Sequence, residues 1–136
     1  MRSTLFGLLA LFGLGNCKKA IENAQEKAVL DAITSGYWTV AKYTKGTTDV
    51  TSHFNLYKFQ FKKNNTVDAL KNQTLEQTGH WEADAANRSI NAHFANAITP
   101  LNLLNGTWTI TKSTWTSVEA TQTIDGENCR LHLNKE

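Results

Sequence analysis

The sequence is poor in cysteine and proline, and it has no strong excess of one charge. Only two cysteines, Cys17 and Cys129, and one proline, Pro100, occur in 136 residues. Lys and Arg number 14 against 12 Asp and Glu, a formal net charge of +2. Proteins that bind nucleic acid use an excess of Lys and Arg to neutralise phosphates and release their counterions. Because this chain has almost no such excess, we expect no nucleic-acid partner. With 40% hydrophobic and 19% charged residues, the composition is that of a globular protein with one core.

Motifs of catalytic and metal-binding sites are also missing. No nucleophile motif and no glycine-rich phosphate loop is present, and nothing pairs Glu82 or Asp84 with a base. The four histidines lack the spacing of metal ligands. We place His53 in a loop, and strand alternation directs three others to solvent: His80, His93 and His132. The sequence therefore predicts a protein that is not an enzyme and that has no catalytic residues, no metal and no cofactor.

The apolar run near the N-terminus, Leu5–Leu14, is too short to span a membrane. Ten residues extend about 15 Å as a helix, whereas the hydrocarbon core of a bilayer is about 30 Å thick. The run follows Arg2 and ends in the small residues Gly13 and Gly15, which is typical of a secretory signal. Residues 1–16 are predicted to be a signal peptide.

Cys17 directly follows this segment. Leu14–Cys17 resembles a bacterial lipobox, except that Asn16 stands where the pattern prefers Gly or Ala. The resemblance implies acylation of Cys17 and cleavage before it, which would anchor the protein to a membrane of the bacterial cell envelope. Several acyl chains bind stably because each buried methylene contributes about 0.8 kcal/mol. The alternative is cleavage after Gly15, which releases a soluble periplasmic protein and allows a disulfide between Cys17 and Cys129.

Residues 17–35 are predicted to form a helical tether between the anchor and the domain. The segment is rich in Ala, Glu, Lys and Gln, which favour helix. Its apolar stripe is thin and recurs at helical spacing in Ile21, Ala24, Ala28 and Ala32. Gly36 is placed to end the helix. We expect a loose start near Lys18 and partial docking on the domain near Val29–Ile33.

After Gly36 the hydrophobic period changes from 3.6 to 2. Tyr57, Phe59 and Phe61, for example, alternate with polar residues, as in strands with one buried face. The same alternation places the Cys129 thiol among core residues. Eight strands are predicted at 37–44, 54–62, 66–71, 75–82, 88–94, 106–112, 115–123 and 128–133. The stretch 95–105 is expected to be a crossing loop with a helical turn whose leucines pack on the domain. This pattern favours an antiparallel barrel or a sandwich over 36–136.

A family resemblance favours the barrel. Gly36-Tyr37-Trp38, then Phe54–Phe61 (FNLYKFQF), then Gly79-His80-Trp81 and Leu104–Trp108 (LNGTW) follow one another in this order. The order resembles the small bacterial lipocalin-like lipoproteins, although Leu56 replaces the family's Gly. The resemblance spans roughly 36–120 and implies an all-β, antiparallel, eight-stranded lipocalin-like barrel preceded by a short helix. It implies little about a ligand.

An aromatic set marks the candidate ligand site. An eight-stranded barrel is just wide enough to be filled by side chains or to hold one small ligand. Phe94 is expected to share the interior, and six aromatic residues are predicted to contact a small apolar ligand there: Trp38, Tyr57, Phe59, Phe61, Trp81 and Trp108. The alternative is that these side chains only fill the core.

Trp115 is predicted to lie outside the barrel and to bind a partner. It shares strand parity with Ser117 and Glu119, opposite to Val118. The alternative is that Leu101 or Leu103 of the crossing loop folds over Trp115 and buries it. We expect either a membrane-anchored lipoprotein that binds a small hydrophobic ligand, or a structural or protein-interaction lipoprotein with a solid barrel and an unknown partner.

Overall fold

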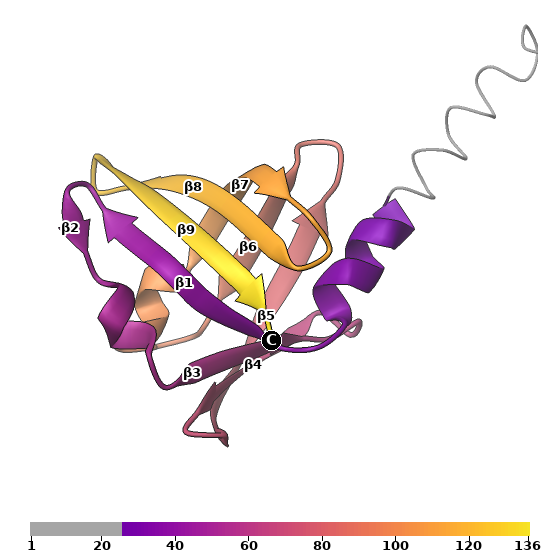
Figure 1. Ribbon diagram of the computed structural model, residues 1–136, viewed down its shortest axis with the longest axis horizontal. Helices are drawn as coiled ribbons and strands as arrows, with labels where there is room; N and C mark the ends of the chain where they lie inside the picture. Colours follow the sequence, from indigo (N-terminus) through magenta and orange to yellow (C-terminus); the bar gives the residue numbers. More distant parts are fainter. Residues whose placement is uncertain (1–25) are drawn as a thin grey trace, which may run out of the picture.

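The computed structural model describes residues 26–136, and Figure 1 shows how their strands curve into a barrel. The predicted signal peptide, the start of the tether and Cys17 lie outside the described residues. The described chain begins with a helix at residues 26–34. Nine strands follow: β1 (Trp38–Lys45), β2 (Thr48–Asp49), β3 (Tyr57–Phe61), β4 (Thr66–Lys71), β5 (Thr74–Asp84), β6 (Ser89–His93), β7 (Gly106–Ser113), β8 (Ser117–Ile124) and β9 (Glu127–Lys135).

The strands form a closed, antiparallel, up-and-down barrel. From β3 to β9 each strand pairs with the next along the chain, while β1 pairs with β3 on one side and with β9 on the other to close the sheet. The two-residue β2 pairs with the end of β1, so eight strands make up the wall. Closure of the described sheet removes its two outer edges, which would be sites of aggregation, although β1 and β3 pair only at Trp38 and Phe59. The predicted fold, an eight-stranded antiparallel barrel preceded by a helix, is therefore confirmed.

The two ends of the barrel differ (Figure 1). At one end, which we call the open end, the hairpins at 62–65, 85–88 and 114–116 lie beside the helix at 26–34. At the other, the closed end, two single-turn 3-10 helices lie across the barrel: η1 (Thr51–Phe54) and η2 (Leu101–Leu104). The helical turn and the packed leucines predicted for 95–105 are thus confirmed in η2, where Leu101 and Leu104 are buried.

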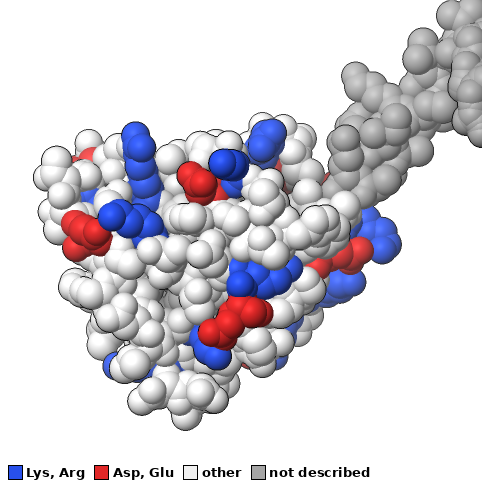
Figure 2. Space-filling model, in the orientation of Figure 1, with Lys and Arg blue, Asp and Glu red and all other residues white. Residues whose placement is uncertain are grey.

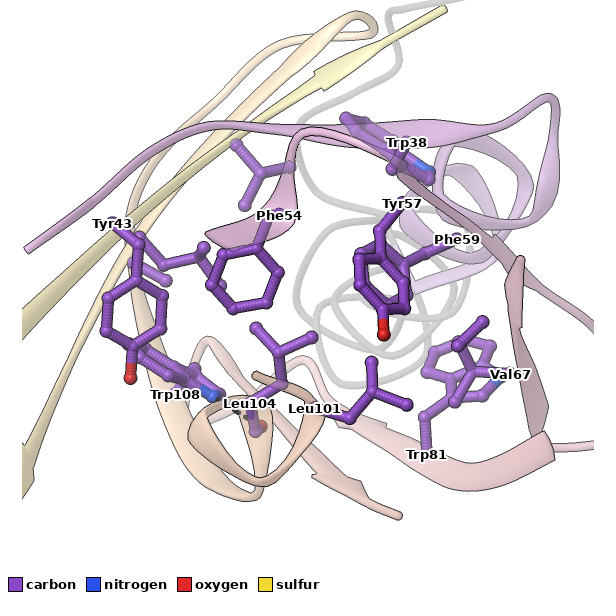
Figure 3. Close-up of a cluster of buried hydrophobic side chains, with 14 of the residues drawn as sticks. Trp38, Tyr43, Phe54, Tyr57, Phe59, Val67, Trp81, Leu101, Leu104 and Trp108 are labelled. Carbon is purple, nitrogen blue, oxygen red and sulfur yellow. Dashed lines mark hydrogen bonds between the residues drawn. The ribbon is translucent and has the colours of Figure 1, made fainter. Parts of the chain in front are cut away.

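One strand begins later than predicted. The expected strand 54–62 begins only at Tyr57, because Phe54 ends η1 and turns its ring into the core. Its ring stacks on Tyr43 with centroids 5.6 Å apart and meets Tyr57 edge-on at 6.4 Å. Figure 3 shows Phe54 among Leu101, Leu104 and these two tyrosines. Phe54 thus closes one end of the barrel from η1, and the regular strand alternation starts only after it, at Tyr57.

A bulge in β1 reverses the alternation along that strand. The register with β9 shifts between Val40 and Lys42, so Ala41 is the extra residue. Trp38 and Tyr43 therefore both point into the core although their positions differ in parity. Tyr43 is fully buried and donates a hydrogen bond from its hydroxyl to the Leu103 carbonyl oxygen at 2.6 Å.

The helix at 26–34 docks through its last turn, as predicted for Val29–Ile33. Ile33 is buried, and its carbonyl oxygen accepts a hydrogen bond from Trp38 Nε1 at 2.9 Å. Lys135 Nζ, at the end of β9, donates to the Ala32 carbonyl oxygen at 2.7 Å and lies 5.0 Å from the centre of the Trp38 ring. Within residues 26–136, no helix has the length and apolar character needed to cross a membrane.

Candidate functional site

The barrel interior contains a small apolar cavity, which we call the barrel cavity. Its volume is about 60 Å³, and every residue that lines it is apolar. Phe59 and Phe94 contribute aromatic rings 6.3 Å apart, while Ala92 and Ala120 leave space where larger side chains would fill the barrel. The site suits an apolar group, because its lining has no charged side chain and the indole N–H of Trp108 already donates to the Leu104 carbonyl oxygen.

A larger cleft, which we call the mouth cleft, lies at the open end between the helix at 26–34 and the barrel rim. Its volume is about 700 Å³. Val29 and Ile33 border it from the helix, and the hairpin after β5 borders it from the barrel. Unlike the barrel cavity, it includes polar and charged groups, among them Asp84 and Arg88. Its volume lies within the range of about 300–1,000 Å³ that is typical of small-molecule sites.

Three residues border both spaces: Ile90, Ile110 and Val118. They belong to β6, β7 and β8, whose inward-facing side chains form the wall between the cavity and the cleft. The two spaces therefore adjoin, with an apolar end inside the barrel and a partly polar end under the helix. This arrangement fits a molecule with one apolar end.

The six predicted ligand residues all point inward, but they divide among three places. Phe59, Phe61 and Trp108 line the barrel cavity, and Trp38 borders the mouth cleft. Tyr57 and Trp81 are buried in the core and line neither space. Burial of the set is thus confirmed for all but the half-buried Phe61, whereas contact with a ligand stays a prediction.

The three tryptophans of the G-x-W motifs share one hydrogen-bonding role. Each donates from its indole Nε1 to a backbone carbonyl oxygen at 2.9 Å: Trp38 to Ile33, Trp81 to Lys62, and Trp108 to Leu104. These bonds tie the strands to the helix, to the β3–β4 hairpin and to η2. The tryptophans therefore satisfy their one polar group within the core, as buried indoles usually do.

The glycines of these motifs serve different purposes. Gly36 and Gly106 have positive φ values of 73° and 117°, a backbone conformation that glycine adopts readily because it has no Cβ. Gly79 is different, because it lies inside β5 and a Cβ there would come within 2.6 Å of the His93 carbonyl oxygen and 2.8 Å of the Phe94 ring. Close packing of Phe94 against β5 therefore requires a glycine at this position.

Buried or partly buried polar groups near the core are paired. Tyr57 donates from its hydroxyl to Glu76 Oε2 at 2.6 Å, and burial together with this carboxylate raises the pKa of Tyr57 to about 12. Cys129, predicted to be buried, is fully buried and is a free thiol in the described chain. Burial and the neighbouring Cys129 raise the pKa of Tyr43 well above its usual value. None of these groups lines either space.

Sequence reasoning missed a serine–histidine pair on the outer wall. Ser117 Oγ lies 2.9 Å from His132 Nε2 across β8 and β9, and His132 is half-buried. Neither residue lines the barrel cavity or the mouth cleft, so no pocket described above would bring a substrate to them. Among residues 26–136, no group of three or more His, Cys, Asp or Glu is placed to hold a metal ion.

Trp115 lies at the bend between β7 and β8 with 62% of its surface exposed. The expected exposure is confirmed, although its strand begins at Ser117 rather than 115. The alternative that Leu101 or Leu103 covers it is wrong, because the side chain is exposed and η2 lies at the end of the barrel opposite to the β7–β8 hairpin (Figure 1).

Comparison with known proteins supports the fold and assigns no function. No protein-family model and no curated protein matches the chain. A crystal structure of a DUF4847 family protein from Bacteroides vulgatus is similar, with a TM-score of 0.57 and 15% sequence identity. The match covers 79% of this chain and 97% of that chain. At this identity, the likeness shows that the two proteins share a barrel fold.

Proposed function

We propose that this protein is an exported bacterial lipoprotein whose barrel binds the apolar end of a small molecule. The role is binding rather than catalysis. The adjoining barrel cavity and mouth cleft carry the proposal. A molecule would place its apolar end past Ile90, Ile110 and Val118, and its remaining part under the helix at 26–34.

The volumes define what kind of ligand fits. The barrel cavity, at about 60 Å³, is smaller than the apolar cavity of about 150 Å³ that is known to take up benzene. It therefore has room for the end of a chain or the edge of a ring. The mouth cleft, at about 700 Å³, has room for the rest. We infer an elongated ligand with a narrow apolar end and a part that tolerates polar neighbours.

Export and anchoring complete the proposal and rest on the N-terminal sequence. The apolar run Leu5–Leu14 supports a secretory signal, and the lipobox-like Leu14–Cys17 supports acylation of Cys17. The protein would then be held on a membrane of the bacterial cell envelope, facing the periplasm or the cell surface. The barrel fold is compatible with the lipocalin-like lipoproteins that the sequence resembles.

A second function is favoured by how much of the barrel is filled. Aromatic residues from β1, β3, β5, β7 and η1, together with Phe94 after β6, occupy most of the interior, which leaves only about 60 Å³. In this alternative the barrel is a solid scaffold, and its outer surface binds a protein partner. The two functions predict different effects of filling the cavity.

The test is to fill the barrel cavity from its wall. Ala120 is buried in β8 and lines the cavity, so Ala120→Leu adds three carbon atoms there. A molecule that copurifies with the native protein would be identified by mass spectrometry. Its affinity, or that of an apolar fluorescent probe, should fall about tenfold or more in Ala120→Leu, a loss of about 1.4 kcal/mol. Ala95→Leu, in an exposed turn, is the matched control and should bind normally.

A solid barrel would behave differently. Neither a copurified molecule nor a bound probe would be found, and thermal unfolding alone would respond to Ala120→Leu. Equal probe affinity in the wild type, Ala120→Leu and Ala95→Leu would also contradict binding in the cavity. Far-ultraviolet circular dichroism of both variants verifies that each has folded.

A further inference from the structure

We propose that the rim of the open end docks on a lipid bilayer, so that the mouth cleft faces the membrane. Trp115, Tyr37 and Val29 form this rim surface. The inference deepens the proposed function and rests on its anchoring step, because the bilayer is the one that would hold Cys17. It supplies a route by which an apolar ligand passes between the bilayer and the barrel.

Trp115 is the main contact of this surface. The other three tryptophans, Trp38, Trp81 and Trp108, are buried and hydrogen-bonded, whereas Trp115 exposes 62% of its surface at the tip of the β7–β8 hairpin. A large aromatic side chain that stays in water does not gain the favourable free energy of burying its apolar surface. Tryptophan and tyrosine are enriched where proteins meet the membrane–water interface, since their rings are apolar with one polar group.

Tyr37 and Val29 lie near Trp115 on the same rim. The Lys135 amide donates to the Thr116 carbonyl oxygen, and the next amide, that of Glu136, donates to the Tyr37 carbonyl oxygen, both at 2.8 Å. The end of β9 thus joins the segment after Trp115 to Tyr37. Val29 borders the mouth cleft from the helix. Tyr37 is 38% exposed and Val29 39%, so both can contact lipid.

The path of the chain places the open end of the barrel next to the proposed anchor at Cys17. Glu26, the first described residue, lies at the open end and follows Cys17 by nine residues. Nine residues reach about 30 Å at most when fully extended. A strand of eight residues, such as β7, extends about 26 Å from one end of the barrel to the other. An anchor at Cys17 therefore favours contact between lipid and the open end.

The charges visible on the barrel wall do not favour a sideways contact. Figure 2 shows blue and red side chains interspersed on the face that carries β1, β8 and β9. Lys42 with Asp49 and Lys45 with Asp125 form ion pairs of 3.0 and 3.5 Å on these elements. This wall offers neither a continuous basic patch for anionic headgroups nor an exposed tryptophan. Compared with this wall, the rim at the open end is the better membrane contact.

The protein's own tryptophans supply the test. The natively acylated protein is reconstituted into phospholipid vesicles whose acyl chains carry bromine, which quenches tryptophan only on contact. Subtracting the fluorescence emission of Trp115→Phe from that of the wild type gives the emission of Trp115 alone. We expect this difference emission to be lost in brominated vesicles and retained in vesicles without bromine.

A tryptophan at the closed end is the matched control. Leu75 is exposed at the start of β5, so Leu75→Trp in the Trp115→Phe background moves the probe to the opposite end of the barrel. Its added emission should persist in brominated vesicles. Equal quenching at both ends would overturn the proposed orientation. Unchanged Trp115 emission would overturn docking altogether and would leave Trp115 to contact a protein partner.

The anchoring step is measured separately. The mass of the N-terminal peptide reports whether Cys17 carries acyl chains. If it does not, the proposed anchoring fails, and brominated vesicles added to the soluble protein then test the rim by itself. Quenching of Trp115 in that sample would still support a membrane-binding rim, and its absence would reject it.

Discussion

At the scale of single residues, buried tryptophans hold the barrel to the segments that cover it. The Trp38 ring packs under Lys135 Nζ and donates to the Ile33 carbonyl oxygen, so one side chain joins β1, β9 and the helix at 26–34. Trp108 does the same for β7 and η2 through Leu104. Such residues contribute apolar burial and a satisfied hydrogen bond together.

Replacing Trp38 by alanine should strongly destabilise the protein. The side chain is 2% exposed, and truncating a buried aromatic residue costs about 3–5 kcal/mol in the free energy of unfolding. Urea denaturation at equilibrium measures this change. Trp115→Ala is the control and should change the free energy of unfolding by about 0.5 kcal/mol or less, because the side chain is exposed. A loss below about 1 kcal/mol for Trp38→Ala would contradict its place in the core.

Asp68 should make stability depend on pH in the acid range. A hydrogen bond from Lys62 Nζ and another from Thr78 Oγ1, both 2.8 Å long, lower the pKa of Asp68 below its usual 3.8. Because the folded state favours the charged form, this contribution is complete above pH 3.8 and is lost as the pH falls through the lowered pKa. Between neutral pH and about pH 2, the melting temperature of Asp68→Asn should therefore fall less than that of the wild type.

A second variant separates this effect from general acid unfolding. Lys62→Met removes the ammonium that contributes most to the low pKa of Asp68. It should also reduce the acid-induced fall in melting temperature, with Thr78 left to stabilise the carboxylate. Identical acid profiles for the wild type and Asp68→Asn would show that this carboxylate is not the source of the effect.

At the scale of elements, the helix at 26–34 is held to the barrel by few buried side chains. Ile33 is its one fully buried side chain, while Val29 remains partly exposed beside the mouth cleft. Elements with few buried apolar contacts open locally at low free-energy cost. We therefore expect the helix to open from the mouth cleft more readily than the barrel wall unfolds.

Ile33→Asp should release the helix without unfolding the barrel. A buried carboxylate with no partner is costly, so the docked state loses stability relative to an open one. Hydrogen exchange of the amides at 26–34 should become faster, while those of β4 and β5 keep their protection. Val29→Asp is the matched control, since Val29 is 39% exposed, and it should leave exchange near the wild-type rate. Faster exchange throughout the barrel would show instead that the helix is part of the cooperative core.

At the scale of the whole molecule, the proposed anchor at Cys17 determines where the barrel is expected to lie in the cell. Replacing Cys17 by serine removes the thiol that we propose to be acylated, and the protein should then move from the membrane fraction to the soluble fraction of the cell envelope. Immunoblotting of the separated fractions measures this shift. A wild-type protein that is already soluble, with Asn16 as its first residue, would support cleavage after Gly15 and would contradict the lipoprotein proposal.

The sequence by itself determined the barrel's strands, because alternation is a local property. Tyr57, Phe59 and Phe61 alternate with polar residues, and this alone directs them to the inner face of β3. Two turns also follow from local sequence. Asn65 and Asp125-Gly126 have positive φ values, which Asn, Asp and Gly tolerate better than other residues. Local preference and hydrophobic pattern agree in these elements, so each was predictable before the strands were paired.

Only the tertiary structure decided which end of the barrel is open and what space remains inside. The bulge at Ala41 turns Tyr43 inward, and Phe54 leaves the strand pattern to close one end. The barrel cavity is the small difference between two large volumes, the barrel interior and the side chains that fill it. The mouth cleft exists because Ile33 docks a helix against strands distant in sequence. Such features depend on how the sheet closes, and alternation along a single strand carries no information about closure.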